Sequence, residues 1–309
     1  MPIKIPRDLP AAKTLQEENI FVMDLARAES QDIRPLRILV LNLMPTKIVT
    51  ETQLARVLGN TPLQIEMDLM AVNREHKHVA AEHMFAFYKS FDEVRDEFYD
   101  GMVITGAPVE HLAFEEVDYW EELCAVMEWS KTHVYSTFHI CWGAQAALYY
   151  HYGIRKLPLE AKLFGVFPHT VTHRGSILFR GFDDVFYVPH SRHTTVSREE
   201  IAACPRLKIL AESDKAGVYA VSTDAGRQIF ITGHSEYDPL TLDSEYRRDL
   251  AAGLPIAVPE NYYPGDDPTR PPRCTWRSSA HLLYANWLNY FVYQATPYNV
   301  ETIPPFATR

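Results

Sequence analysis

A single cysteine, Cys141, stands where a thiol could act as a nucleophile. It lies in HICWGAQAALYYHYG (139–153), between an apolar run that predicts a strand ending at Ile140 and an alanine-rich run that predicts a helix from about Trp142. A tight strand-to-helix turn exposes a nucleophile at the edge of an α/β sheet, and the start of the helix can stabilise a thiolate and bind an oxyanion, here through N–H groups such as that of Trp142. Taken alone, the pattern is more often that of a packed cysteine.

A histidine and a glutamate further along the chain could supply the missing base. An apolar run in RQIFITGHSEYDP (227–239) leads into His234 and Glu236, and His234 follows Cys141 by 93 residues (234 − 141). Residues two apart on an extended segment point to the same side, so Glu236 can orient the ring of His234 while the ring accepts a thiol proton. A His-x-Glu pair is weak evidence by itself, but together with the Cys141 turn it favours a Cys-His-Glu triad.

Composition narrows the class of protein. The chain has 309 residues, 47% of them hydrophobic, and 30 Lys+Arg against 40 Asp+Glu, which gives a net charge of −10. A single large core is therefore possible, and non-specific binding to nucleic acid is disfavoured. The cysteines are dispersed and have no metal-ligand spacing, and we find no signal peptide or membrane span. We expect a cytoplasmic enzyme of small metabolites with no membrane association and no metal site. The four cysteines are Cys124, Cys141, Cys204 and Cys274.

The first half of the chain alternates strands and helices. Residues 1–35 read as an irregular, proline-punctuated N-terminal arm, and residues 36–309 read as a single α/β domain. Dense aliphatic runs predict buried strands near 36–43, 63–70, 99–104 and 133–140, and helices are predicted at 46–59 and 120–129. Such alternation predicts a parallel sheet with flanking helices on both faces and ligands at the carboxyl ends of its strands.

The second half is less regular. Segments 207–213, 217–223 and 227–234 predict short strands in hairpin-like succession, and segment 238–253 predicts a helix that Gly253 ends. Residues 254–273 are rich in proline and predict a long ordered loop or lid, because the apolar segment 278–294 beyond them predicts a helix that needs a core to cover.

These motifs resemble a known fold and family. CWGAQ (141–145) and HSE (234–236) resemble the class I glutamine amidotransferase-like, or flavodoxin-like, fold, whose nucleophile elbow reads G-x-C-x-G-x-Q; His139 departs from its first glycine. RPLRILVLNLMPTK, FGVFPH, PHSRHT and GHSEYDPLTLDSEYRRD resemble the homoserine O-acyltransferase family of methionine biosynthesis. The similarity extends over essentially the whole chain, including the N-terminal arm and the C-terminal helix.

The resemblance implies acyl transfer from an acyl-CoA to the hydroxyl of L-homoserine. In that scheme Cys141 carries the acyl group as a thioester, His234 is the general base and Glu236 its partner. The acyl-CoA is a co-substrate, so no bound cofactor is implied, the other partners are small molecules, and a homodimer is expected. Without the family match, Arg248 would read as a surface arginine of a helix. The positions that correspond to the family's substrate-binding residues are Lys162, Ser191 and Arg248.

The resemblance also points to the acyl group. Glu110, in GAPVEHL, matches a family position at which glutamate accompanies acetyl transfer and glycine accompanies succinyl transfer. A fixed carboxylate would repel and displace the succinyl carboxylate, so acetyl-CoA is the predicted donor and succinyl-CoA the alternative. Glu110 could also simply favour the N-terminal dipole of a helix beginning near His111. A glutamine amidotransferase subunit and a metabolite-binding protein on the same fold remain rival interpretations.

Overall fold

The protein is built around one large mixed sheet. The computed structural model describes residues 3–6, 8–18, 22–23, 34–72 and 81–307. Within them the strands run in the order β2-β1-β4-β3-β6-β7-β12-β11-β10-β8-β9, with β5 beside β4. The pairs from β2 to β12 are parallel, and those from β12 to β9 are antiparallel. The predicted parallel sheet is thus confirmed for the half that carries Cys141 and is extended by an antiparallel half.

The bounds of the strands follow the apolar runs of the sequence. Every residue of β6 is buried, as expected for a strand covered on both faces. The strands are β1 Ile3–Lys4, β2 Val22–Met23, β3 Leu36–Leu41, β4 Ile65–Met70, β5 Tyr88–Lys89, β6 Tyr99–Ile104, β7 Val134–Ile140, β8 Lys156–Val171, β9 Val185–Val196, β10 Leu207–Ser213, β11 Gly217–Thr223 and β12 Gln228–Ile231.

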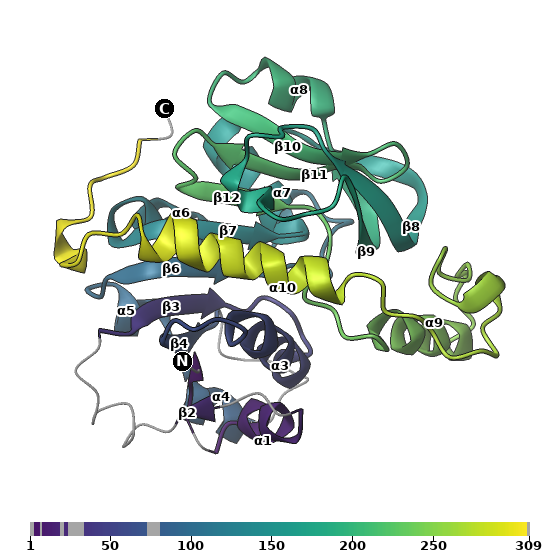
Figure 1. The fold of residues 1–309 in the computed structure, drawn as a ribbon, viewed down its shortest axis with the longest axis horizontal. Helices are drawn as coiled ribbons and strands as arrows, with labels where there is room; N and C mark the ends of the chain where they lie inside the picture. Colours follow the sequence, from purple (N-terminus) through teal and green to yellow (C-terminus); the bar gives the residue numbers. More distant parts are fainter. Residues whose placement is uncertain (1–2, 7, 19–21, 24–33, 73–80, 308–309) are drawn as a thin grey trace.

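The helices lie on both faces of this sheet. The α-helices are α1 Pro10–Glu17, α3 Lys47–Leu58, α4 Ala81–Phe87, α5 Phe91–Val94, α6 Trp120–His133, α7 Trp142–Tyr152, α8 Arg198–Ala203, α9 Thr241–Ala251 and α10 Arg277–Asn286. Short helical turns are η1 Phe114–Glu116, η2 Ile177–Phe179, η3 Pro264–Asp266 and η5 Val300–Thr302, and α10 continues as the π-helix η4 Trp287–Tyr293. Figure 1 shows α10 lying across the central strands, close to α3.

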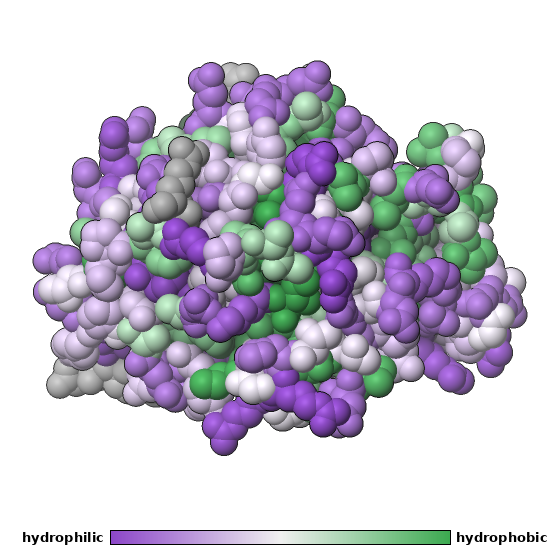
Figure 2. Space-filling model, turned by 90° about the horizontal axis from the view of Figure 1, so that it is seen from above, coloured by the Kyte–Doolittle hydropathy of each residue, from purple (hydrophilic) through white to green (hydrophobic). Residues whose placement is uncertain are grey.

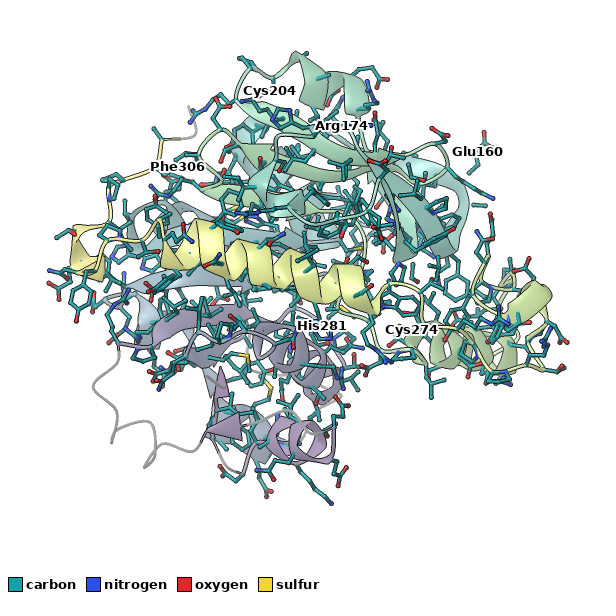
Figure 3. The ribbon with its side chains drawn as sticks, viewed as in Figure 1. Glu160, Arg174, Cys204, Cys274, His281 and Phe306 are labelled. Carbon is teal, nitrogen blue, oxygen red and sulfur yellow. The ribbon has the colours of Figure 1, made fainter. Side chains whose placement is uncertain are left out.

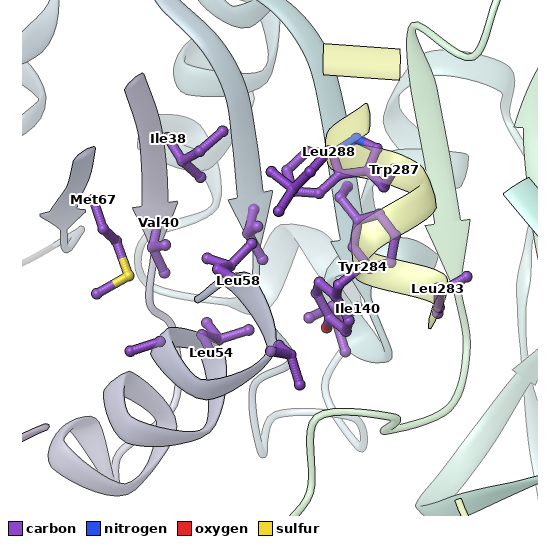
Figure 4. Packing of buried hydrophobic residues seen from close by; sticks show 14 of the residues in the cluster. Ile38, Val40, Leu54, Leu58, Met67, Ile140, Leu283, Tyr284, Trp287 and Leu288 are labelled. Atoms are coloured by element: carbon purple, nitrogen blue, oxygen red, sulfur yellow. The ribbon is translucent and has the colours of Figure 1, made fainter. Parts of the chain in front are cut away.

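Two apolar clusters hold the helices against the sheet. On one face α3 and α10 pack side chains such as Leu58 and Tyr284 against the central strands (Figure 4). Trp287 belongs to this cluster and its indole N–H donates to Ser136 Oγ at 3.0 Å, so the large ring is buried without an unpaired donor. On the other face α6 and α7 contribute a second cluster that includes Trp142. The site at the strand ends is therefore supported by a rigid core on both sides.

The N-terminal arm corrects one expectation. The prediction of an irregular conformation is wrong for the parts of the arm that the structure describes. There, β1 pairs in parallel with β4, and residues Pro10–Glu17 form the helix α1. The buried side chains of Leu9 and Leu15 join the cluster beneath α3. Proline at the first position of α1 suits a helix start, since its missing N–H would have no partner there. The division between an arm and a domain at residue 35 stays a prediction.

The long hairpin of β8 and β9 was not predicted. Its two strands pair antiparallel from Lys156↔Val196 to Thr170↔Val185, with a register shift between Pro158 and Leu163. The three shorter predicted strands, now β10, β11 and β12, are confirmed, and β10 joins this hairpin to the sheet through β8.

The proline-rich loop is pinned to β8. Glu260 N–H donates to Phe164 C=O at 3.0 Å and Val166 N–H donates to Glu260 C=O at 2.8 Å. Gly165, with φ at 148°, allows this approach, because a Cβ there would lie 2.4 Å from the Glu260 oxygen. The loop and α9 pack over a small cluster that includes Tyr262 and Trp276. The loop is ordered, as predicted, and fixes α9 beside the β8–β9 hairpin (Figure 1).

The surface is mixed in character. Seen from above, hydrophilic residues dominate that face and separate smaller hydrophobic patches (Figure 2). No helix in the described part of the chain is both long and apolar enough to cross a lipid bilayer.

Candidate functional site

Cys141 occupies the turn that the sequence predicts. β7 ends at Ile140 and α7 begins at Trp142, so Cys141 is the residue between them, with φ 49° and ψ −115°. Such a conformation is strained for a residue with a Cβ and is held by the surrounding structure. Here the Cys141 N–H donates to Ile231 C=O at 2.7 Å, which ties the turn to β12.

The base comes from the neighbouring strand. β12 pairs in parallel with β7, with Ile231 opposite Ile140, so the residues that follow both strands emerge at the same sheet edge. His234 there has a side-chain hydrogen bond with Cys141, and its Nδ1 lies 2.7 Å from Glu236 Oε1. The predicted grouping of these three side chains is therefore present in the structure.

Electrostatics favours a charged His234 ring. Burial lowers the pKa of His234, but the charges of Cys141 and Glu236 and the hydrogen bonds to both outweigh burial and hold the pKa well above 6.5. The ring of Tyr237 stacks on His234 with the ring centres 4.1 Å apart and fixes its orientation. An imidazolium held against a sulfur is the arrangement that activates a cysteine nucleophile.

Gly106 brings a third strand to the site. It follows β6, and a Cβ built on it would lie 3.3 Å from Cys141 Cβ and 3.5 Å from His234 Cε1. The backbone after β6 thus passes against both reacting side chains. The signal for this residue is present in the sequence as a glycine two residues after a buried strand.

Trp142 provides the expected helix start. It is the first residue of α7, and the first N–H groups of a helix have no acceptor within the helix. Its indole is fully buried, 5.7 Å from the ring of Phe114. The use of its backbone N–H as an oxyanion donor stays a prediction.

Two predicted substrate-binding residues meet around carboxylates of α9. Ser191 Oγ donates to Glu245 Oε2 at 2.6 Å, and Lys162 Nζ lies 3.6 Å from that oxygen and 3.7 Å from Asp249 Oδ2. The Tyr237 hydroxyl reaches Glu245 Oε1 at 3.4 Å and so connects this polar cluster with the ring that stacks on His234. Sequence reasoning missed Glu245, Asp249 and Tyr237.

Arg248 lies at the margin of the cluster. Its guanidinium contacts Asp249 at 2.7 Å, while its side chain is 67% exposed. Asp249 is thus shared between Arg248 and Lys162.

Glu110 lies in the turn after β6. Its carboxylate accepts a hydrogen bond from the backbone N–H of His193 on β9, and Lys156 Nζ donates to its main-chain oxygen at 2.8 Å. The alternative in which Glu110 favours a helix beginning near His111 is wrong, because residues 110–111 form a turn and the next α-helix, α6, starts at Trp120.

His139, the departure from the amidotransferase pattern, has a structural place. Its ring is buried, stacks on Phe230 with the ring centres 4.9 Å apart, and its Nδ1 lies 3.0 Å from Ile229 C=O. The residue therefore fastens β7 to β12, which position the nucleophile and the base. A side chain at this point is compatible with the elbow.

A buried lysine was also missed. Lys47 begins α3 just after the carboxyl end of β3, and its Nζ donates to Asn42 C=O at 2.5 Å. Burial lowers the pKa of Lys47 to about 8, against the opposing charge of Glu51. Since β3 is parallel to β6 and β6 to β7, Lys47 lies along the same edge of the sheet as Cys141.

The remaining cysteines belong to other elements than the β7–α7 turn, with Cys124 in α6. Cys204 follows α8 and Cys274 precedes α10, and the two lie far apart in the view of Figure 3. All four cysteines are free thiols. Within the described residues, no group of three histidine, cysteine or acidic side chains is arranged to hold a metal ion.

The sheet, the elbow and the Cys-His-Glu grouping define the class of the protein as a class I glutamine amidotransferase-like α/β fold. A glutamine amidotransferase of Thermotoga maritima superposes with a TM-score of 0.52 at 14% identity, covering 84% of this chain and 99% of that one. A structure titled SMU.1228c superposes with a TM-score of 0.55 at 16% identity, covering 82% and 99%. Identities this low show the fold alone.

The sequence comparisons show the family. The sequence profile described as HTS, homoserine O-succinyltransferase, matches residues 2–298, so the chain belongs to that family. A protein of Acetivibrio thermocellus named homoserine O-acetyltransferase is 60% identical over 304 residues, which is 98% of this chain and 100% of that protein. A protein of Clostridium novyi with the same name is 62% identical over 299 residues, covering 96% and 99%.

Proposed function

We propose that the protein is a homoserine O-acetyltransferase that moves an acetyl group from acetyl-CoA to the hydroxyl of L-homoserine through an acyl-thioester on Cys141. The observation that carries this proposal is the hydrogen bond between His234 and Cys141, the residue that precedes α7. Glu236 holds the His234 ring in place, with its Oε1 2.7 Å from His234 Nδ1. The names of the relatives and the family support acyl transfer to homoserine.

The first half-reaction loads the cysteine. The thiolate of Cys141 attacks the carbonyl carbon of acetyl-CoA, and the tetrahedral oxyanion is held by helix-start N–H groups such as that of Trp142. When the intermediate collapses, the bond to the CoA sulfur breaks and the imidazolium of His234 protonates the departing thiolate. Acetyl-Cys141 and a neutral His234 remain, while Glu236 keeps the ring in place.

The second half-reaction transfers the acetyl group. His234 takes the proton of the homoserine hydroxyl as its oxygen attacks the thioester carbonyl. The carbon–sulfur bond then breaks, O-acetylhomoserine leaves, and Cys141 returns as a thiolate beside the imidazolium. No resident cofactor or metal is needed at any step.

The polar cluster under α9 is suited to the amino acid substrate. Homoserine carries an ammonium and a carboxylate, and the cluster combines the carboxylates of Glu245 and Asp249 with the ammonium of Lys162. Ser191 can donate a hydrogen bond, and Arg248 can turn from Asp249 to bind the substrate carboxylate in a bidentate pair.

The donor is acetyl-CoA rather than succinyl-CoA. Glu110 is held in place by the His193 N–H, so its carboxylate is a fixed negative charge beside β9. A succinyl group ends in a carboxylate that this charge repels, whereas an acetyl group carries no charge.

One assay tests this function against its alternatives. The purified full-length protein is given L-homoserine with acetyl-CoA or succinyl-CoA, and release of the free CoA thiol is followed; hydrolysis of L-glutamine is measured in parallel. We expect higher kcat/KM with acetyl-CoA and parallel-line, ping-pong kinetics. Faster turnover with succinyl-CoA contradicts the donor assignment, and glutamine hydrolysis without homoserine acylation favours the amidotransferase.

The cellular setting follows from the same proposal. Four free cysteines suit the reducing cytoplasm. A homodimer is the assembly that the family resemblance suggests, with small molecules as the other partners.

A further inference from the structure

Arg192 is a buried cation, and its hydrogen-bond partners in the described part of the chain are all uncharged. It lies on β9 and is 1% exposed. Its guanidinium donates to Thr194 C=O at 2.6 Å, to Ala216 C=O at 2.5 Å and to His190 Nδ1 at 3.3 Å. These bonds use three of the five N–H groups of an arginine and neutralise none of its charge. A buried charge without a counter-charge is unfavourable, so nearby anions matter.

The histidine partner is itself uncharged. Because Arg192 can only donate, His190 Nδ1 must accept, and His190 Nε2 then carries the hydrogen that faces His169 Nε2 at 3.2 Å. His169 in turn donates through Nδ1 to Phe167 C=O at 2.9 Å. Burial lowers the pKa of His169 to about 4 and that of His190 well below 6.5. The chain of bonds that leads away from Arg192 therefore carries no negative charge.

Arg192 is placed between the elements of the proposed active site. Thr194 C=O, which accepts from Arg192, also accepts from Gln145 Nε2 at 3.2 Å, and the Gln145 N–H bonds the Cys141 C=O at 3.1 Å. On the other side, the N–H of His193, the next residue along β9, donates to the carboxylate of Glu110.

Within the described part of the chain, Cys141 and Glu110 are the groups whose charges oppose the burial of this guanidinium. Burial lowers the pKa of Arg192 to about 10, while the charges of Cys141 and Glu110 oppose that lowering. When Cys141 is acylated, its sulfur can carry no negative charge, because a thioester is neutral. Glu110 is then the carboxylate that balances Arg192 in the acyl-enzyme.

We propose that Arg192 is a specificity-determining residue. The Glu110 carboxylate balances the buried charge of Arg192. Where residue 110 is neutral, the Arg192 charge instead favours an acyl group that ends in a carboxylate. This inference rests on the proposed acyl transfer and on Glu110 lying beside the acyl group. Glutamate at position 110 therefore acts in two ways, by repelling a second carboxylate and by satisfying the cation that would otherwise attract one.

Other charged groups face Glu110 and must be tested beside Arg192. Lys156 donates through Nζ to Glu110 C=O at 2.8 Å and to Leu112 C=O at 2.5 Å, and it is partly exposed. The rings of His111 and His193 lie 4.7 Å apart near the same turn. Since solvent screens Lys156 more than the buried Arg192, Lys156 is the matched control for a nearby cation.

A set of variants separates these groups. The full-length enzyme carries Glu110→Gly alone or combined with Arg192→Gln, Arg192→Lys or Lys156→Gln, and kcat/KM is measured with succinyl-CoA and acetyl-CoA. We expect Glu110→Gly to raise the succinyl-to-acetyl ratio, and Arg192→Gln to lower that raised ratio by about tenfold or more, mainly through the KM for succinyl-CoA. Arg192→Lys should keep most of the ratio, and Lys156→Gln should change it by less than about threefold. A ratio that survives Arg192→Gln, or that Lys156→Gln removes, overturns the inference.

A second measurement leaves Arg192 intact and so does not depend on how its variants fold. Glu110→Gly enzyme is given succinyl-CoA or 4-oxopentanoyl-CoA, in which a methyl group replaces the carboxylate oxygen at nearly the same size. We expect at least about tenfold higher kcat/KM with succinyl-CoA. Equal rates show that Glu110→Gly merely opens space and overturn the inference. Loss of acyl transfer from every donor, in the wild type as well, instead counts against the proposed function.

Discussion

Gly143 is the position at which the geometry of the elbow can be perturbed most sharply. It is the second residue of α7, and a Cβ built on it would lie 2.4 Å from Thr105 C=O and 3.0 Å from Ile104 C=O. Both oxygens belong to the backbone at the end of β6 and cannot rotate away. Ordinary contact begins at 3.4 Å, so Gly143→Ala must move the start of α7 by about 1 Å (3.4 − 2.4).

The expected loss of activity is larger than the loss of stability. Overpacking of this kind reduces the free energy of unfolding by about 1–3 kcal/mol. A displacement of about 1 Å at a reacting group lowers the rate by about 10²-fold, and here Cys141 moves relative to His234. We therefore expect kcat/KM for homoserine acetylation to fall about 100-fold while the folded variant still unfolds cooperatively.

The other end of the same helix provides the control. Gly153 ends α7 with φ at 70°, and a Cβ there would meet no atom within 4 Å. Gly153→Ala therefore adds backbone strain of about 1–2 kcal/mol without a clash and without moving the elbow. Urea unfolding and steady-state kinetics on both variants test the reasoning. Near wild-type activity for Gly143→Ala, or an equal loss of activity for both, refutes it.

Two further predictions concern charge. Glu236→Gln removes the carboxylate that stabilises the charged ring of His234, so kcat of the folded variant should fall by about 10²–10⁴-fold; an unchanged rate contradicts the triad. Burial lowers the pKa of His139 to about 4 from its ordinary 6.5, so the unfolded state binds more protons between these values and stability should decline as pH falls from 6.5 to 4, by about 3 kcal/mol from this residue. His139→Phe, which can still stack on Phe230, should flatten that decline in urea titrations by about one proton, and an unaltered slope contradicts the assignment.

The parts of the fold that the sequence predicts are those with local signals. The elbow, β10 to β12, α3, α7 and α9 follow from apolar periodicity and from glycines at helix ends, all within a few residues. The β8–β9 hairpin lacked such a signal, because Lys156–Val171 contains prolines and a polar stretch and becomes a strand only by pairing with β9. The arm likewise gains its strand β1 only by pairing with β4, which lies 62 positions away in the sequence, as in the pair of Ile3 with Ile65 (65 − 3).

The site divides in the same way. Cys141, His234 and Glu236 were predictable because the chemistry requires these residue types, and because each follows an apolar run that predicts a strand. Glu245 and Asp249 were not, since an acidic residue on a polar helix reads as solvated until the fold brings α9 to Lys162. Arg192 was hidden for a related reason: nothing in its neighbours along the chain indicates that its guanidinium is buried.

The proposed mechanism depends above all on Cys141 carrying the acetyl group. The direct measurement is mass spectrometry of the intact protein and of its peptides after brief exposure to acetyl-CoA without homoserine. We predict one acetyl group per chain, located on Cys141, released when homoserine is added, and absent from Cys141→Ala; Cys204→Ala should label like the wild type. Turnover with no acetyl group on Cys141, or with Cys141→Ala still active, would contradict the acyl-enzyme mechanism.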